Sequence, residues 1–352
     1  MKIRLFTIFF ILLILVSCTK KDYSEKINLD SVDSFFKITD ELSSGNIVTE
    51  EEWDSIFNTQ GYRTLLFHNQ WRRPMLKEML LIAYSQKYSS KQDSILNLSN
   101  NGMLSKLILE NYLDMKHKRD SLIDFRNTYD FTSVINDSKA DLKSFLDNPV
   151  DSLLIFPSIS IACFESAGYS QENGIIMDFN LFFEQSHSEN VGFLAHEMFH
   201  FYRDNFIDYE FSKINTFAFQ IERLQNEGIA DLIDKKHLPY KNDAFPEQVK
   251  LFNKIAYDTP QRLAELDSIV CMFYDGKMTL EQFNNKMSGF FKLGGHPNGF
   301  YISCLIRDAG FNNEMISTFY NPVGFLKLYN KAAKRKGKYC FSDKFLDYIN
   351  RL

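Results

Sequence analysis

The sequence predicts a mostly helical α+β protein in which a small sheet packs against a helix that carries two histidines. Three observations indicate this class. Apolar residues recur at three- and four-residue spacings over most of the chain, as in amphipathic helices. Short apolar runs without that period follow Asn148-Pro149 and predict strands. The chain has 352 residues, 45% of them hydrophobic, which suffices for a substantial apolar core.

The N-terminus predicts export. Lys2 and Arg4 precede an apolar run over 5–16, which is too short to span a bilayer but fits the core of a secretory signal. The following Leu15-Val16-Ser17-Cys18 resembles the lipobox of bacterial lipoproteins. The resemblance implies a signal peptide over 1–18, lipidation of Cys18, and a membrane-anchored protein on the periplasmic or cell-surface side. The alternative is an uncleaved anchor with an incidental cysteine.

The rest of the chain divides into three regions. Residues 19–30 are polar and predict a tether. Residues 31–148 have helical periodicity and predict a helical N-terminal region. Residues 149–352 are expected to form the catalytic region, which ends in a helical C-terminal part. Within it we expect strands over 153–156, 159–164 and 174–179 and two long helices over about 188–209 and 214–236.

Charge and cysteine content exclude some kinds of site. The formal net charge is −5 and no basic stripe is visible, so nucleic acid is not an expected partner. The four cysteines after Cys18 are widely spaced, with no C-x-x-C pair, so they do not predict a metal site. Apolar neighbours favour buried free thiols, although an exported chain can form disulfides; these cysteines are Cys163, Cys271, Cys304 and Cys340.

The chemistry is predicted by His196-Glu197-Met198-Phe199-His200, an H-E-x-x-H motif within the first long helix. Side chains at positions i and i+4 of a helix lie one above the other, so both imidazoles can bind one metal ion. Glu197 projects at the edge of that face, where a carboxylate can take a proton from an activated water. The structural alternative is a pair of histidines on an ordinary amphipathic helix.

A third ligand is expected in the next helix, within Asn226-Glu227-Gly228-Ile229-Ala230-Asp231. A catalytic zinc site has three protein ligands and an open position. Glu227 and Asp231 lie on one helix face, and two buried carboxylates are costly unless a cation meets them. The alternatives are an ordinary acidic helix face, or exchanged roles in which Asp231 is the ligand.

The two motifs together resemble those of the gluzincin metallopeptidases, the family of thermolysin. The resemblance covers about 188–235, and the segment between the motifs is longer than in thermolysin. It implies one Zn²⁺ ion bound by His196, His200 and Glu227, with Glu197 as general base. It also implies that Asp231 orients a ligand imidazole, His196 in the first instance. The whole chain looks like the uncharacterised predicted zinc-peptidase lipoproteins of bacteria.

Further candidates lie outside the two motifs. A developing oxyanion needs a second donor, and His296 or Tyr301, which follow Gly294-Gly295, could supply it. The expected strand at 174–179 either pairs with an extended substrate or is a plain core strand. Arg203 and Arg223 either bind a substrate carboxylate or lie in solvent.

The sequence thus predicts a zinc metallopeptidase whose substrate is a peptide or protein outside the cytoplasm. Two alternatives stay open. One is a catalytically silent surface-binding lipoprotein on a peptidase scaffold, against which the intact Glu197 speaks. The other is a zinc hydrolase of another amide or an ester, because activated water does not specify the bond.

Overall fold

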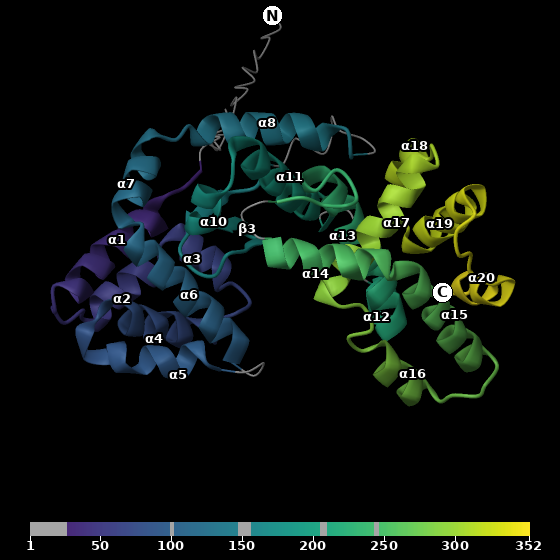
Figure 1. The fold of residues 1–352 in the computed structure, drawn as a ribbon, viewed down its shortest axis with the longest axis horizontal. Helices are drawn as coiled ribbons and strands as arrows, with labels where there is room; N and C mark the ends of the chain where they lie inside the picture. Colours follow the sequence, from purple (N-terminus) through teal and green to yellow (C-terminus); the bar gives the residue numbers. More distant parts are fainter. Residues whose placement is uncertain (1–26, 99–101, 147–155, 205–209, 243–245) are drawn as a thin grey trace, which may run out of the picture.

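The structure, a computed structural model, describes residues 27–98, 102–146, 156–204, 210–242 and 246–352. This part of the chain is mostly helical with one three-stranded sheet, which confirms the predicted α+β class (Figure 1). The predicted signal peptide, with Cys18, lies outside the described residues. Packed structure begins within the expected tether, because Ile27 is buried and Asn28 bridges to Ser160. None of the described helices is long and apolar enough to cross a membrane.

The N-terminal region is helical, as its periodicity predicts. One of its helices begins with a capping box, in which the Thr49 side chain accepts from the Glu52 N–H and Glu52 accepts from the Thr49 N–H. The described elements are α1 (Asp30–Ser43), α2 (Glu50–Phe57), α3 (Gln60–Leu65), α4 (Arg72–Tyr84), η1 (Gln86–Lys91), α5 (Gln92–Leu96), α6 (Met103–His117), α7 (Arg119–Thr128) and α8 (Phe131–Lys143).

The sheet has the strand order β1-β3-β2. Its strands are β1 (Ile159–Ala162), β2 (Gly168–Gln171) and β3 (Gly174–Asp178), with β1 parallel and β2 antiparallel to β3. β1 and β3 confirm two predicted strands. Of the third, 153–156, only Phe156 lies within the described residues, and it is not in a strand. β3 is a fully buried central strand, so of its two sequence interpretations the core strand is correct.

The helices after the sheet position both motifs. They are α10 (Phe179–Glu184), α11 (His187–Asp204), α12 (Glu210–Lys213) and α13 (Thr216–Asp234). α11 packs against β2, β3, α8 and α13, so the sheet supports the helix of the first motif. Asn215 is the N-cap of α13, and its side chain accepts a hydrogen bond from the Ala218 N–H.

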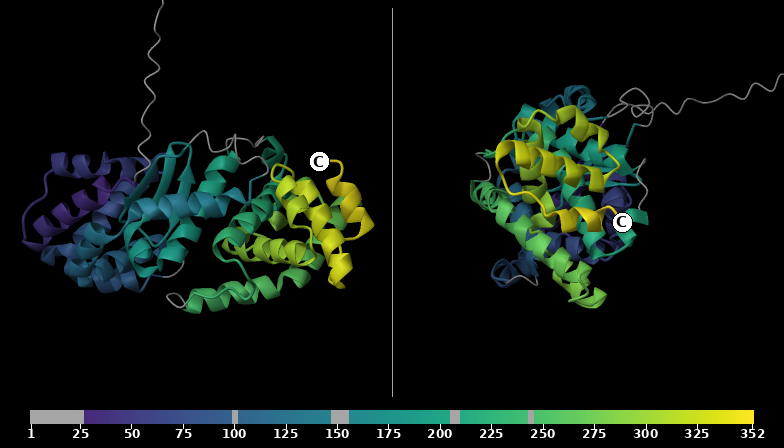
Figure 2. Two further views of the ribbon diagram at one scale, coloured as in Figure 1. Left: turned by 90° about the horizontal axis from the view of Figure 1, so that it is seen from above. Right: turned by 90° about the vertical axis from the view of Figure 1, so that its right-hand side faces the viewer.

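The C-terminal part is again helical and lies at the opposite end of the molecule from α1–α5 (Figures 1 and 2). Its helix α17 packs closely on α13 and begins directly after Gly294 and Gly295, which both have positive φ. The elements are α14 (Pro246–Tyr257), α15 (Thr259–Tyr274), α16 (Leu280–Met287), η3 (Leu293–Gly295), α17 (His296–Asp308), α18 (Asn312–Ser317), α19 (Pro322–Lys336) and α20 (Asp343–Ile349).

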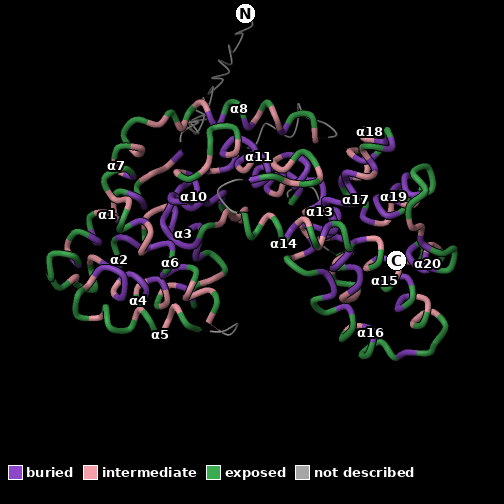
Figure 3. The backbone as a smooth tube through the Cα atoms, in the orientation of Figure 1, coloured by how far each residue is buried: buried purple, intermediate pink, exposed green. Residues whose placement is uncertain are grey.

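Buried apolar side chains from all three regions form one cluster, which reaches from Ile27 to Ile349 in the sequence. Figure 3 shows buried residues gathered along α11, α13 and α17, whereas the outer helix α16 is largely exposed and α5 has no buried residue. The four cysteines within the described residues are free thiols; Cys163 and Cys304 are buried, and Cys271 and Cys340 are partly buried.

Candidate metal centre

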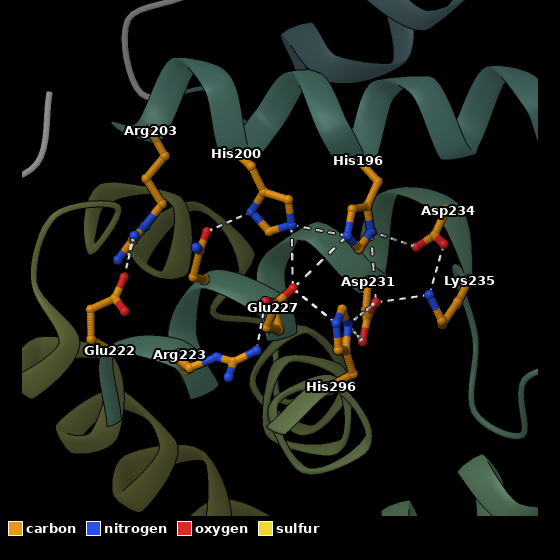
Figure 4. Close-up of polar contacts among 11 residues, drawn as sticks. His196, His200, Arg203, Glu222, Arg223, Glu227, Asp231, Asp234, Lys235 and His296 are labelled. Atoms are coloured by element: carbon orange, nitrogen blue, oxygen red, sulfur yellow. Dashed lines mark hydrogen bonds and ion pairs between the residues drawn. The ribbon is translucent and has the colours of Figure 1, made fainter. Parts of the chain in front are cut away.

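Helix α11 brings the two motif histidines together. The Nε2 atoms of His196 and His200 are 3.0 Å apart, as expected for imidazoles one helical turn apart (Figure 4). His196 is 5% exposed, so this pair is inside the protein rather than on a solvated helix face. Of the structural alternative, two exposed or core histidines on an amphipathic helix, burial excludes the exposed form.

Helix α13 brings Glu227 to the same point. Its Oε2 lies 3.2 Å from Nε2 of His200 and 3.9 Å from Nε2 of His196. Tetrahedral zinc with bonds of about 2.0–2.1 Å places its ligand atoms about 3.3 Å apart. The three atoms therefore have nearly the spacing of a zinc ligand set. Among the described residues, His196, His200 and Glu227 form one of two groups that could hold a metal ion; the other is His196, Asp231 and His296.

The outer ring nitrogens show which atoms face inward. Nδ1 of His200 lies 2.9 Å from Oδ1 of Asn226, and Nδ1 of His196 lies 3.3 Å from Oδ1 of Asp234. Because both neighbours are acceptors, each Nδ1 donates, and a neutral ring then presents the lone pair of Nε2 to the centre. There the buried Oε2 of Glu227 has no hydrogen-bond partner among the described residues. Three converging lone pairs fit a bound cation.

The charges around this point also favour a cation. Burial by itself would lower the pKa of His200, but the carboxylates of Glu227 and Glu197 raise that pKa to about 10. Burial would raise the pKa of Glu227, but His200 and His296 hold it well below its usual range. Together His196, His200, Glu197 and Glu227, called the histidine cluster below, stabilise positive charge between their side chains. Either a proton or a metal ion can carry that charge.

Glu197 lies beside the metal-binding group and does not belong to it. It is 6% exposed, and a Cβ atom on Gly168 would lie 3.1 Å from its Oε1, so the carboxylate lies against the start of β2. Burial raises the pKa of Glu197, and His196 and His200 partly offset that rise. A raised carboxyl pKa suits a general base, because proton transfer is most effective with a pKa near the working pH.

Helix α17 adds His296 to the cluster. Its Nδ1 lies 3.1 Å from Oδ1 of Asp231, and its Nε2 lies 3.3 Å from Oε2 of Glu227. The side chain is one-third exposed, so it lines the opening of the centre. Tyr301, the other predicted oxyanion donor, is 9% exposed and makes no hydrogen bond with the cluster among the described residues. The structure thus brings His296, and not Tyr301, to the centre.

The arrangement of carboxylates differs from the expected one. Asp231 lies 3.6 Å from Nδ1 of His196, farther than the 3.1 Å to His296. The carboxylate closest to His196 is that of Asp234, at 3.3 Å. Lys235 lies 2.8 Å from Asp231 and 2.7 Å from Asp234, so its charge compensates the buried pair. Asp231 is therefore placed to orient the ring of His296, and Asp234 is placed to orient the ring of His196.

Asn226, Asp234 and Lys235 were not among the predicted site residues. Helical spacing gave a weak indication of Asp234 and Lys235, because they lie one turn after Asp231, at the last residue and the C-cap of α13. Asn226 precedes the expected ligand Glu227 directly. Their roles follow from the rotation of α13 relative to α11, which the sequence pattern does not specify.

Comparison with known proteins adds the family. No curated protein and no solved structure matches the chain. A family model described as "Putative zinc dependent peptidase (DUF5700)" matches residues 53–338, a range that contains both motifs and all the residues of the cluster. That range is most of the chain, and the chain belongs to this family of zinc-dependent peptidases.

Proposed function

We propose that the chain is a gluzincin-like zinc metallopeptidase, in which His196, His200 and Glu227 bind a single zinc ion. The observation that carries the proposal is the convergence of two inward-facing Nε2 atoms on the unpartnered Oε2 of Glu227. Family membership supports zinc-dependent peptidase activity. When bound, zinc supplies the Lewis acidity that activates a water molecule and polarises a carbonyl group.

The remaining steps fall to side chains of this protein. Glu197 takes the proton of the attacking water and passes it to the leaving amine. His296 donates a hydrogen bond to the negative charge that develops on the carbonyl oxygen, and Asp231 holds its ring in place through Nδ1. Burial would lower the pKa of His296, but Asp231 and Glu227 raise it, which favours a ring that can donate.

The substrate backbone is proposed to pair with β2 rather than with β3. β3 has a strand on each side, whereas β2 is an edge strand within the described residues. The N–H of Asp178 donates to the carbonyl of Ala167, so by antiparallel alternation Gly168 and Ser170 direct their backbone polar groups away from β3. Gly168 also lies against Glu197, so a peptide on this edge would pass the general base.

A cleft of about 810 Å³ next to this edge has room for a peptide. It reaches from the N-terminal region to the C-terminal part, and its walls include Leu107, Ala167, Phe193, Val249 and Leu293. Asp234 and Lys235, which border the histidine cluster, also line this cleft.

A peptide or protein outside the cytoplasm is the proposed substrate. The enzyme is proposed to be anchored to a membrane through a lipid on Cys18, and the lipobox-like sequence supports this location.

The direct test replaces Glu197 with Gln. Loss of the base should lower the rate of peptide hydrolysis by roughly 10²- to 10⁴-fold, while zinc content stays at the wild-type level. Hydrolysis is measured by mass spectrometry on a mixed peptide library, with Glu281→Gln on the exposed face of α16 as the control. Wild-type hydrolysis by Glu197→Gln would contradict the mechanism. A zinc-loaded wild type that cleaves no peptide would favour a silent binding protein or a hydrolase of another bond.

A further inference from the structure

Arg223 lies at the opening of the metal centre. It is on α13, one turn before Glu227, and its Nη2 lies 3.7 Å from Oε1 of Glu227 (Figure 4). The Arg223 side chain is 38% exposed, whereas that of Glu227 is 12% exposed. The guanidinium group is therefore on the solvent-facing side of the buried ligand, where a bound molecule can reach it.

The glycine loop before α17 makes room for this guanidinium group. A Cβ atom on Gly294 would lie 2.4 Å from Nη2 of Arg223 and 3.6 Å from Cδ2 of His296. Gly294 has a φ of +65°, which side-chain-bearing residues rarely adopt. The guanidinium group also lies over the ring of Phe219, whose centroid is 5.7 Å from Cζ of Arg223. The backbone thus leaves a site for Arg223 directly beside His296.

The hydrogen-bond donors of Arg223 are available. No described residue accepts a hydrogen bond from its guanidinium group, and the 3.7 Å contact with Glu227 is longer than a hydrogen bond. A cation bound by Glu227 would also compensate the charge of that carboxylate. The charge of Arg223 would then be available to a ligand. Lys235, a second cation near the cluster, is bound to Asp231 and Asp234 instead.

Arg203 shows the contrast within the same pair of helices. It is fully buried, and its guanidinium group donates to Glu222 and Gln225 of α13. Arg203 therefore joins α11 to α13 and cannot contact a substrate. Of the two arginines that the sequence left undecided, Arg223 has the exposure and the free donors that ligand binding needs.

We propose that Arg223 binds a carboxylate group of the substrate within one residue of the scissile bond. The inference rests on the proposed peptidase function and adds a substrate class to it. A guanidinium fork matches the two oxygens of a carboxylate, and such charge-assisted pairs are among the strongest hydrogen bonds. The carboxylate is either the C-terminus of the peptide or the side chain of an Asp or Glu residue next to the cleaved bond.

The test compares matched peptides that differ only in this group. One pair has a free or an amidated C-terminus one residue after the cleaved bond, and a second pair has Glu or Gln at that position within a longer peptide. Arg223→Gln should lower kcat/KM roughly 10- to 100-fold for the carboxylate peptide and change little for its neutral partner. The pair that responds identifies the source of the carboxylate. Arg223→Lys should restore part of the loss, and Lys292→Gln, an exposed charge near the same loop, serves as the control.

A purely structural role for Arg223 predicts a different result. If Arg223 only holds Glu227 in place, Arg223→Gln loses zinc and both members of each pair lose activity equally; this result would overturn the proposal.

Binding of an N-acylated dipeptide and its amide to zinc-loaded Glu197→Gln, with and without Arg223→Gln, is measured by calorimetry. Tighter binding of the acid that disappears with Arg223→Gln supports the proposal even if no peptide is cleaved. The Glu and Gln peptides are measured in the same way, and equal binding within both pairs contradicts the proposal.

Discussion

At the scale of single residues, Asp178 joins three segments of the N-terminal half. Its carboxylate accepts hydrogen bonds from the backbone N–H groups of Phe164 and Leu181, at 2.8 and 3.0 Å, and from Nδ2 of Asn111, at 3.0 Å. These bonds connect the end of β3 to α6, to the segment that follows β1 and to the first turn of α10. Asp178 is fully buried, and its burial raises its pKa to about 7 in spite of the three donors.

This raised pKa predicts how stability depends on pH. Between about pH 4 and pH 7 the folded chain holds a proton on Asp178 that the unfolded chain has released, so the free energy of unfolding should fall as pH rises. The contribution is on the order of 4 kcal/mol over that range. Urea unfolding of the wild type and of Asp178→Asn from pH 4 to pH 8 checks it, because the variant should lack this slope. Parallel pH dependences would contradict the prediction, whatever the offset between the two proteins.

Much of the candidate site could be predicted from residue spacing. His196 and His200 had to face one point because a helix places positions i and i+4 together, and Glu227 followed as a third oxygen or nitrogen ligand. The partners of the outer ring nitrogens could not be predicted in the same way. Whether Asp231 or Asp234 meets His196 depends on a rotation of α13 by less than one turn, which packing with α11 and α17 decides.

At the scale of elements, α13 and α17 approach each other backbone to backbone. A Cβ atom on Gly228 would lie 2.5 Å from the carbonyl of Gly299, and one on Gly299 would lie 2.3 Å from the carbonyl oxygen of Leu224. The absence of both side chains lets the helices approach closely. Because Glu227 is on α13 and His296 is on α17, this contact sets their separation.

The contact predicts a large effect of one methyl group. Gly299→Ala should force α17 away from α13 and lower the free energy of unfolding by about 1–3 kcal/mol. Zinc affinity should fall as well, since Glu227 moves relative to α11. Ser303→Ala on the same helix is the control, because its buried hydroxyl has no hydrogen-bond partner among the described residues. Equal urea unfolding curves and zinc titrations for the two variants would refute this account of the contact.

The strands show which elements the sequence could predict. β1 and β3 are runs of buried apolar residues and were expected. β2 reads Gly168-Tyr169-Ser170-Gln171 and is only partly buried, so it lacks the apolar pattern of a strand. It pairs because the turn before Gly174 returns the chain along β3, a tertiary effect that residue patterns do not capture.

At the scale of the whole molecule, the cleft is made by segments that lie far apart in the sequence. Leu107 comes from α6, Phe193 from α11 and Val249 from α14. In Figure 1, α6 lies among the N-terminal helices, and α11 and α14 lie between these helices and the C-terminal ones. No sequence pattern could predict this cleft, because it depends on how two helical regions dock on either side of the sheet and the motif helices.

Membrane attachment is a prediction for the whole protein that rests on its first residues. If Cys18 is lipidated, the wild type should take up a labelled fatty acid in a bacterial host and sediment with membranes. Cys18→Ser should lose both the label and the sedimentation, because a single apolar run over 5–16 is too short to span the bilayer. Cys340→Ser should behave like the wild type. An unlabelled wild type that still sediments would indicate an uncleaved anchor instead.

The most direct test of the account is the zinc content of residues 19–352, for the wild type and for Glu227→Ala, by elemental analysis. The convergence of His196, His200 and Glu227 predicts close to one zinc ion per wild-type chain and a sharp loss in the variant. Thermal unfolding of the wild type should shift upward on zinc addition, because a ligand that binds the folded state stabilises it. A wild type that holds no zinc after careful reconstitution would contradict the central claim.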